Sequence, residues 1–202
     1  AVRDVASWLR KPSPLNLVKG GFEHVYGFGV SQTGRMLRHF LYLGLNLDEQ
    51  GEAAFDGLMP HVAGGRRGEF NHRFAQPSNQ SKPGFGHLFP FADNETVDPL
   101  TESKDGLLKR QRELETMPKT IYTNSSAEYW RGDGSLTHID PGGCKDLDPA
   151  TETRIYHFAG TQHGAGSLPQ ASDSGPDGVR ARYPVNVVDY APLLRATLIN
   201  LD

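Results

Sequence analysis

The sequence has 202 residues, enough to bury one substantial core, and we expect a single domain over residues 1–202. Its 21 basic and 24 acidic side chains give a formal charge of −3, which excludes the strongly basic surface typical of proteins that bind nucleic acid. The single cysteine, Cys144, excludes an internal disulfide. No apolar run approaches the roughly 20 residues of a membrane span. We therefore expect a small-molecule partner, no nucleic acid and no membrane.

The hydrophobic pattern alternates between helical and extended segments along the chain. Residues 24–31, for example, are apolar and rich in strand-forming types. The pattern predicts, in chain order, a helix over 2–9, a strand within 24–31, a helix over 34–47, strands within 55–64, 119–126 and 153–160, and a helix over 187–201. In the last helix Asp189 is the expected N-cap, and one face carries Leu194, Leu198 and Leu201. Strands that alternate with helices predict an α/β fold with a mostly parallel sheet and flanking helices.

One long segment interrupts this alternation. Residues 64–117 are dense in Gly, Pro, Asn and Phe, and only 103–116 have a helical pattern. A stretch of this length without strands is typical of a functional insertion, so we interpret 64–117 as a lid within the domain. Its phenylalanines are either the core of the lid or the wall of an acyl or aromatic pocket. On the second interpretation Phe70 and Phe74, together with Trp130, bind the substrate.

The first predicted strand ends at a serine that lies among glycines, in the sequence GFGVSQTGR. A tight turn from strand to helix presents a serine to substrate and directs helix N–H groups at a developing oxyanion. Gly29 and Gly34 provide the small residues that such a turn needs. Thr33 stands where the pattern G-x-S-x-G has its second glycine, so the match is imperfect. The sequence therefore makes Ser31 a candidate nucleophile, and a serine that only caps the helix is the alternative.

A serine nucleophile needs a base and an acid, and residues of both kinds follow later strands. Glu128 comes directly after the strand within 119–126, and His163 follows the strand within 153–160. Both are therefore expected on loops at the carboxyl edge of the sheet, where Ser31 also emerges. The order serine, carboxylate, histidine is that of the α/β-hydrolase triad. The nearby alternatives are Asp133 and Asp140 for the acid, and His138 and His157 for the base.

Several longer phrases resemble the α/β-hydrolase superfamily, and more closely the family described as "alpha/beta hydrolase domain". They are GFGVSQTGRMLRHFLYLGLN, FDGLMPHVAG, FNHRFAQP, YTNSSAEYW and YHFAGTQHG, which together run over nearly the whole chain. The resemblance implies a serine carboxylic-ester hydrolase that needs no cofactor. It implies Ser31 as the nucleophile, Glu128 as the acid, His163 as the base, and the amide of Gln32 as one oxyanion donor.

The sequence also departs from the α/β-hydrolase pattern in one respect. A full α/β-hydrolase has further strands before the nucleophile strand, and a loop among them gives the second oxyanion donor, but no such strands precede residue 22. We therefore expect a partial fold, the C-terminal half, with the nucleophile strand at a sheet edge. Such an edge favours pairing with another chain, so we predict a homo-oligomer or association with a missing N-terminal portion. The alternative function is a non-catalytic half-hydrolase that acts as a binding or assembly module.

A metal site is the last possibility that the sequence raises. His61, His72 and His87 are potential zinc ligands, but their spacing does not fit a helical His-Glu-x-x-His arrangement. We therefore favour structural or pocket-lining roles for these histidines and predict no metal.

Overall fold

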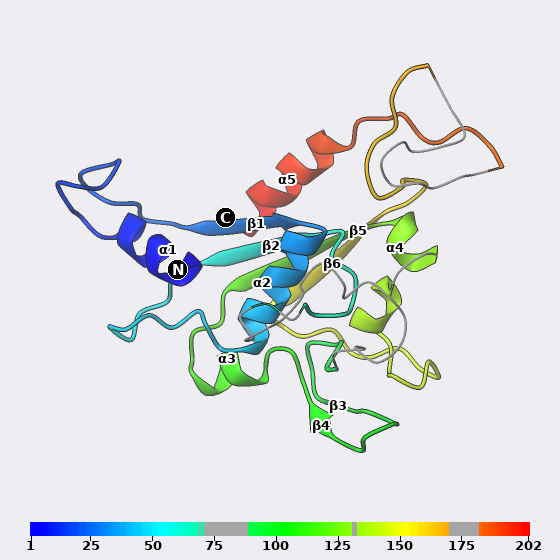
Figure 1. The fold of residues 1–202 in the computed structure, drawn as a ribbon, viewed down its shortest axis with the longest axis horizontal. Helices are drawn as coiled ribbons and strands as arrows, with labels where there is room; N and C mark the ends of the chain where they lie inside the picture. The colour runs from blue at the N-terminus through cyan, green and yellow to red at the C-terminus, as the bar shows by residue number, and fades with distance from the viewer. Residues whose placement is uncertain (69, 71–88, 131–132, 170–181) are drawn as a thin grey trace.

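The sheet has the predicted parallel architecture. The computed structural model describes residues 1–68, 70, 89–130, 133–169 and 182–202. Four parallel strands form one sheet in the order β1-β2-β5-β6, namely β1 (Tyr26–Val30), β2 (Gly57–His61), β5 (Lys119–Ser125) and β6 (Thr153–Phe158). Their carboxyl ends meet at one edge of the sheet, and α4 lies just beyond β5 there (Figure 1). As expected, β1 is an edge strand.

Helices alternate with these strands as the sequence predicts, but the helix after Ser31 ends at Tyr42 rather than Leu47, and the last helix begins at Ala191 rather than Val187. The helices are α1 (Val2–Arg10), α2 (Gln32–Tyr42), α3 (Lys109–Glu113), α4 (Ser126–Trp130) and α5 (Ala191–Leu201), with a 3₁₀ helix, η2 (Gly134–Thr137), after α4. In the part of the chain that the structure describes, none of the helices has both the length and the apolar character to cross a bilayer.

The two faces of the sheet bury different clusters, because neighbouring residues of a strand point to opposite sides. On β2, Leu58 belongs to the cluster under α2, whereas Met59 belongs to the cluster under α5. The α2 cluster contains Leu37, Phe40, Leu41, Phe55, Leu58, Leu107, Leu108 and Tyr122 among its buried residues. The α5 cluster contains Met59, Ile121 and Leu201. The main core therefore lies between the sheet and α2.

Two further details of α5 differ from the sequence predictions. Leu198 of α5 is 40% exposed, and the buried residues of this helix are Thr197 and Leu201, so the predicted apolar face was wrong at Leu198. Asp189 precedes the N-cap residue, which is Tyr190, but its Oδ1 still accepts the N–H of Ala191 at 2.9 Å. A carboxylate therefore supports the first turn from one position earlier than expected.

The segment over 64–117 contains strands, contrary to the sequence prediction. β3 (Thr96–Val97) and β4 (Lys104–Asp105) form an antiparallel pair, and α3 is much shorter than the predicted helix over 103–116. Buried arginine side chains attach this segment to α2. Arg38 of α2 donates hydrogen bonds to the carbonyls of Gly65 and Phe91. The lid role of the segment stays a prediction.

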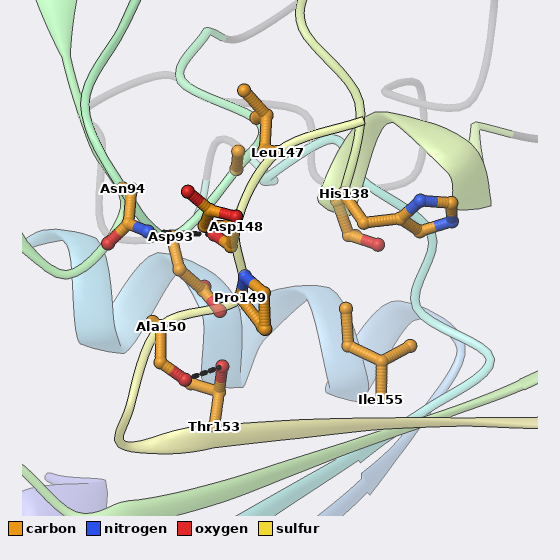
Figure 2. Close-up of a pocket in the computed structure, with 11 residues that line it drawn as sticks. Asp93, Asn94, His138, Leu147, Asp148, Pro149, Ala150, Thr153 and Ile155 are labelled. Carbon is orange, nitrogen blue, oxygen red and sulfur yellow. Dashed lines mark hydrogen bonds between the residues drawn. The ribbon is translucent and has the colours of Figure 1, made fainter. Parts of the chain in front are cut away.

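Figure 2 shows a small cavity between this segment and β6. Its volume is about 10 Å³, and Asp93, Thr153 and Ile155 are among the residues that line it. Asp93 is buried and accepts a hydrogen bond from the hydroxyl of Tyr122 at 2.7 Å. A cavity of this size holds about one water molecule. Since Tyr122 lies on β5, its hydrogen bond to Asp93 joins the segment to the sheet beside this cavity.

Candidate active site

Ser31 lies in a strained turn between β1 and α2. Its φ is 53° and its ψ is −113°, a conformation that non-glycine residues rarely adopt, and its N–H donates to the carbonyl of His61 at 2.9 Å. Gly29 permits the turn, because an added Cβ would lie 2.6 Å from the carbonyl oxygen of Thr33. Ser31 makes no side-chain capping hydrogen bond to α2. Its hydroxyl is therefore not used as a helix cap.

Thr33 explains how the turn forms without the second glycine of the usual pattern. Its hydroxyl accepts the N–H of Val30 at 2.8 Å and donates to the carbonyl of Val30, also at 2.8 Å. The side chain is exposed, so it needs no space between helix and sheet. Gly34 occupies the crowded position instead, since an added Cβ would lie 3.0 Å from Cβ of Ala63. The turn thus uses glycine only at the two close contacts.

Ser31, His163 and Glu128 form one continuous chain of hydrogen bonds. Nε2 of His163 lies 3.0 Å from Oγ of Ser31, and Nδ1 lies 2.6 Å from Oε1 of Glu128. Because Nδ1 faces a carboxylate, Nδ1 carries the proton, and Nε2 accepts the hydrogen bond from Ser31. His163 follows β6 at the same sheet edge as Ser31. Glu128 is on α4, a one-turn helix rather than the predicted loop.

Glu128 is buried, yet its surroundings favour the ionised form. Its side chain is 7% exposed, and its Oε2 accepts the backbone N–H of Ser125 at 2.9 Å as well as the hydroxyl of Ser125. Burial alone would raise the pKa of Glu128, but the hydrogen bonds from His163 and Ser125 outweigh it, so the pKa lies below its ordinary value. A carboxylate is therefore present to orient His163 at neutral pH.

Comparison with known families agrees with the fold. The family model described as "Alpha/beta hydrolase domain" matches residues 1–202. The chain belongs to the alpha/beta hydrolase domain family. Among curated proteins and among solved structures, none matches the chain. Membership indicates a hydrolase-like function for this hydrolase domain but does not identify its substrate.

The alternative acids of the hydrolase domain are engaged elsewhere. Asp133 accepts both the backbone N–H of Arg66, at 2.6 Å, and its Nε, at 2.8 Å. Asp140 accepts backbone N–H groups of its own turn, including that of Cys144 at 2.8 Å. Neither carboxylate has a hydrogen bond to His163 among the contacts of the described residues. Glu128 is the carboxylate that the structure brings to His163.

The alternative bases are likewise bound to other partners. His157 lies 3.1 Å from the hydroxyl of Ser126, and His138 lies 3.2 Å from the hydroxyl of Tyr129. His61 is buried, and its Nδ1 lies 2.8 Å from Oγ1 of Thr123. Burial lowers the pKa of His61 and so favours its neutral form. Of these histidines, His163 is the one whose ring contacts Ser31.

The histidines considered above as possible metal ligands lie only partly within the described residues. His61 is the one member of the group within that part, and His72 and His87 lie outside the described residues. No cluster of three potential metal-binding side chains occurs among the described residues.

The predicted substrate-binding residues have different placements. Phe70 is partly buried, and its ring lies 6.3 Å from that of His39, two turns into α2. Trp130 ends the helix that carries Glu128 and is 87% exposed. Phe74 lies outside the described residues. Substrate binding by these three side chains stays a prediction.

Gln32 has the position expected of an oxyanion donor. It is the first residue of α2, directly after Ser31. The first N–H groups of a helix have no carbonyl partner within the helix, and the helix dipole places partial positive charge there. The amide of Gln32 can therefore donate to a negative oxygen formed next to Ser31.

Ser125 is a site residue that the sequence analysis missed. It is fully buried at the end of β5, and both its N–H and its hydroxyl donate to Glu128. The signal in the sequence was its separation of three residues from Glu128, which places both groups on one tight turn. A serine at a strand end is too common for that signal alone to identify it.

Proposed function

We propose that this hydrolase domain is a serine carboxylic-ester hydrolase that works through an acyl-enzyme intermediate. The observation that carries the proposal is the continuous chain of hydrogen bonds from Ser31 through His163 to Glu128. A nucleophile in contact with a base, and a base oriented by a third group, are the features required for covalent catalysis by serine.

The first half of the reaction forms the acyl-enzyme. Nε2 of His163 removes the proton of Ser31 as Oγ attacks the ester carbonyl, and Glu128 stabilises the imidazolium that results. The tetrahedral oxyanion accepts a hydrogen bond from the amide of Gln32. Collapse of the intermediate breaks the bond to the alcohol oxygen, which takes the proton from His163. The alcohol leaves, and the acyl group remains on Ser31.

The second half repeats these steps with water. His163 removes a proton from water as the water oxygen attacks the acyl carbonyl, and the same amide stabilises the second oxyanion. Collapse releases the carboxylic acid and returns the proton to Oγ of Ser31. The three side chains are thereby restored without any cofactor in the cycle.

The proposal is tested by hydrolysis of short-chain p-nitrophenyl esters. We expect Ser31→Ala to lower kcat by about 10⁴-fold or more, because the nucleophile is lost. Ser103→Ala is the matched control, since Ser103 is exposed on the β3–β4 hairpin, and its activity should equal that of the unmodified protein. Equal turnover by Ser31→Ala and the control would overturn the mechanism.

Covalent labelling separates this proposal from the second candidate, a non-catalytic binding or assembly module. The observation that favours the module is the position of β1 at the sheet edge, where an unpaired strand can add another chain. A fluorophosphonate should modify Ser31 if the serine is activated. No labelling of a folded sample would support the module.

A further inference from the structure

The buried carboxylate of Glu128 has an unusual set of partners for a charged group. It accepts hydrogen bonds from His163 on Oε1 and from the N–H and hydroxyl of Ser125 on Oε2. A buried charge is costly unless hydrogen bonds replace the water that it loses. Ser125 provides two of these three donors, its backbone N–H and its side-chain hydroxyl.

The hydroxyl of Ser125 has a fixed direction. Its oxygen accepts the N–H of Ala127 at 3.2 Å, which leaves its own proton for Oε2 of Glu128. Ser125 is also fully buried at the end of β5, where the ladder with β6 fixes its backbone opposite Phe158. The Ser125 hydroxyl is therefore held in place by contacts that do not involve Glu128.

We propose that Ser125 is a positioning residue that keeps the carboxylate of Glu128 ionised and turned toward His163. This inference rests on the proposed function, because it assigns Ser125 a role in that same site. With Oε2 held by Ser125, Oε1 is the oxygen presented to Nδ1 of His163. Without the hydroxyl, the Glu128 carboxylate has one hydrogen-bond donor fewer, so its negative charge is less stabilised. Binding of an additional proton by the coupled pair of Glu128 and His163 then becomes more favourable.

Other charged and titratable groups act on Glu128 from the surrounding elements. Arg35 of α2 and His61 of β2 interact electrostatically with Glu128, in addition to the direct contact with His163. Asp133, just after α4, is paired with Arg66. Replacement of Ser125 changes none of these groups, so a change in titration isolates the loss of the hydroxyl.

Ser126 provides a matched control at the next position. Its hydroxyl accepts the N–H of Gly160 at 3.0 Å and lies 3.1 Å from Nε2 of His157, and among the described residues it makes no hydrogen bond to Glu128. Ser126→Ala therefore removes a hydroxyl from the same turn and leaves the donors to Glu128 in place. A change that only loosens the turn would appear in both variants.

The experiment measures kcat/KM for a p-nitrophenyl ester against pH. In Ser125→Ala we expect the acid limb to move to higher pH by about one unit, the size expected for a lost hydrogen bond to a charged group. On that limb, kcat/KM should fall by about tenfold. Ser125→Thr keeps a hydroxyl and should restore the original limb, and Ser126→Ala should leave the limb unmoved. An unmoved limb in Ser125→Ala, or an equal shift in Ser126→Ala, would overturn the inference.

A second measurement does not depend on turnover. The proton between Nδ1 of His163 and Glu128 should give a low-field NMR resonance that is absent in His163→Gln, and its titration midpoint should rise in Ser125→Ala. If the protein hydrolyses no ester but this midpoint rises, the proposed function fails and the placement of Ser125 stands. If ester hydrolysis is normal and the midpoint stays, the role of Ser125 fails. Should Ser125→Ala not fold, Ser125→Cys keeps a weaker donor, and a smaller rise in the same direction is expected.

Discussion

The two faces of the sheet differ in how completely they are covered. Under α2 the core is continuous, and the buried polar side chains of Arg38 and Asp93 both contact Tyr122 of this cluster. Under α5 the buried cluster is small, and two residues of β1 on this side, Phe28 and Val30, are 53% and 42% exposed. Both faces border the same sheet edge, which carries the candidate site. Ser31 is thus supported by a well-packed helix on one side and by a sparsely covered strand on the other.

This difference indicates which contacts stabilise the candidate site. Ser31 begins α2, so the packing of that helix under the main cluster sets the position of its backbone. His163 contacts the other side through Tyr190, whose hydroxyl donates to the carbonyl of His163 at 3.3 Å. Tyr190 is the N-cap residue of α5. We therefore expect stability to depend chiefly on the α2 face, and association with other chains on the β1 edge, whose side chains toward α5 are exposed.

The largest expected effect is on the core under α2. Leu58→Ala should lower the free energy of unfolding by about 3–4 kcal/mol, because Leu58 is fully buried at the centre of the sheet and its loss leaves a cavity. Leu201→Ala, under α5, should cost about 2 kcal/mol, since a terminal helix over a small cluster can move to fill the space. Urea unfolding measures both. A larger loss in Leu201→Ala would reverse the comparison.

A smaller effect is expected from an ion pair between α3 and the start of β6. The hydrogen bond from Arg112 lowers the pKa of Glu152 to about 2, so this stabilisation is complete above about pH 4.5 and is lost as the pH falls toward 2. Glu152→Gln should lower the free energy of unfolding by about 1 kcal/mol at pH 7 and change it little at pH 2. Urea unfolding at both pH values tests this. Glu113→Gln, an exposed change on α3, is the control and should be neutral at both.

The smallest effect on stability is expected at the exposed side of β1. Phe28→Ser should change the free energy of unfolding by less than about 0.5 kcal/mol, because the ring is already half exposed. If chains associate along this edge, light scattering should show a smaller particle for Phe28→Ser than for the unmodified protein. Leu100→Ser, at an exposed residue outside β1, should leave the size unchanged. A monomeric unmodified protein would contradict the proposed association.

Much of the fold could be predicted because its elements have strong local signals. The alternation of apolar strands with the amphipathic helix after Ser31 predicted the parallel sheet, and the glycines around Ser31 predicted the turn. The parts that were missed have weak signals. β3 and β4 have two residues each, too few for alternation to appear. Leu198 has the right spacing for burial but is 40% exposed, because among the described residues Thr197 and Leu201 are the ones that α5 buries.

The site was partly predictable for a related reason. Ser31, Glu128 and His163 follow strands, and parallel strands bring the residues after their carboxyl ends to one edge. Ser125 was missed because its importance depends on the direction of one hydroxyl, which the three-dimensional arrangement of β5 and α4 determines. The sequence can thus locate groups that share an edge. It cannot identify the donors that hold them.

The hydrogen bonds of the candidate triad also differ in how far apart their residues lie in the chain. Ser125 reaches Glu128 across three positions, whereas His163 reaches Ser31 across 132. Closing a long loop costs more entropy than forming a turn, so the acid end can assemble early in folding and the serine contact only when the sheet is complete. An incompletely folded chain would therefore contain an oriented carboxylate but no activated nucleophile. Under the proposed function, reactivity toward esters would in this way be confined to chains that have finished folding.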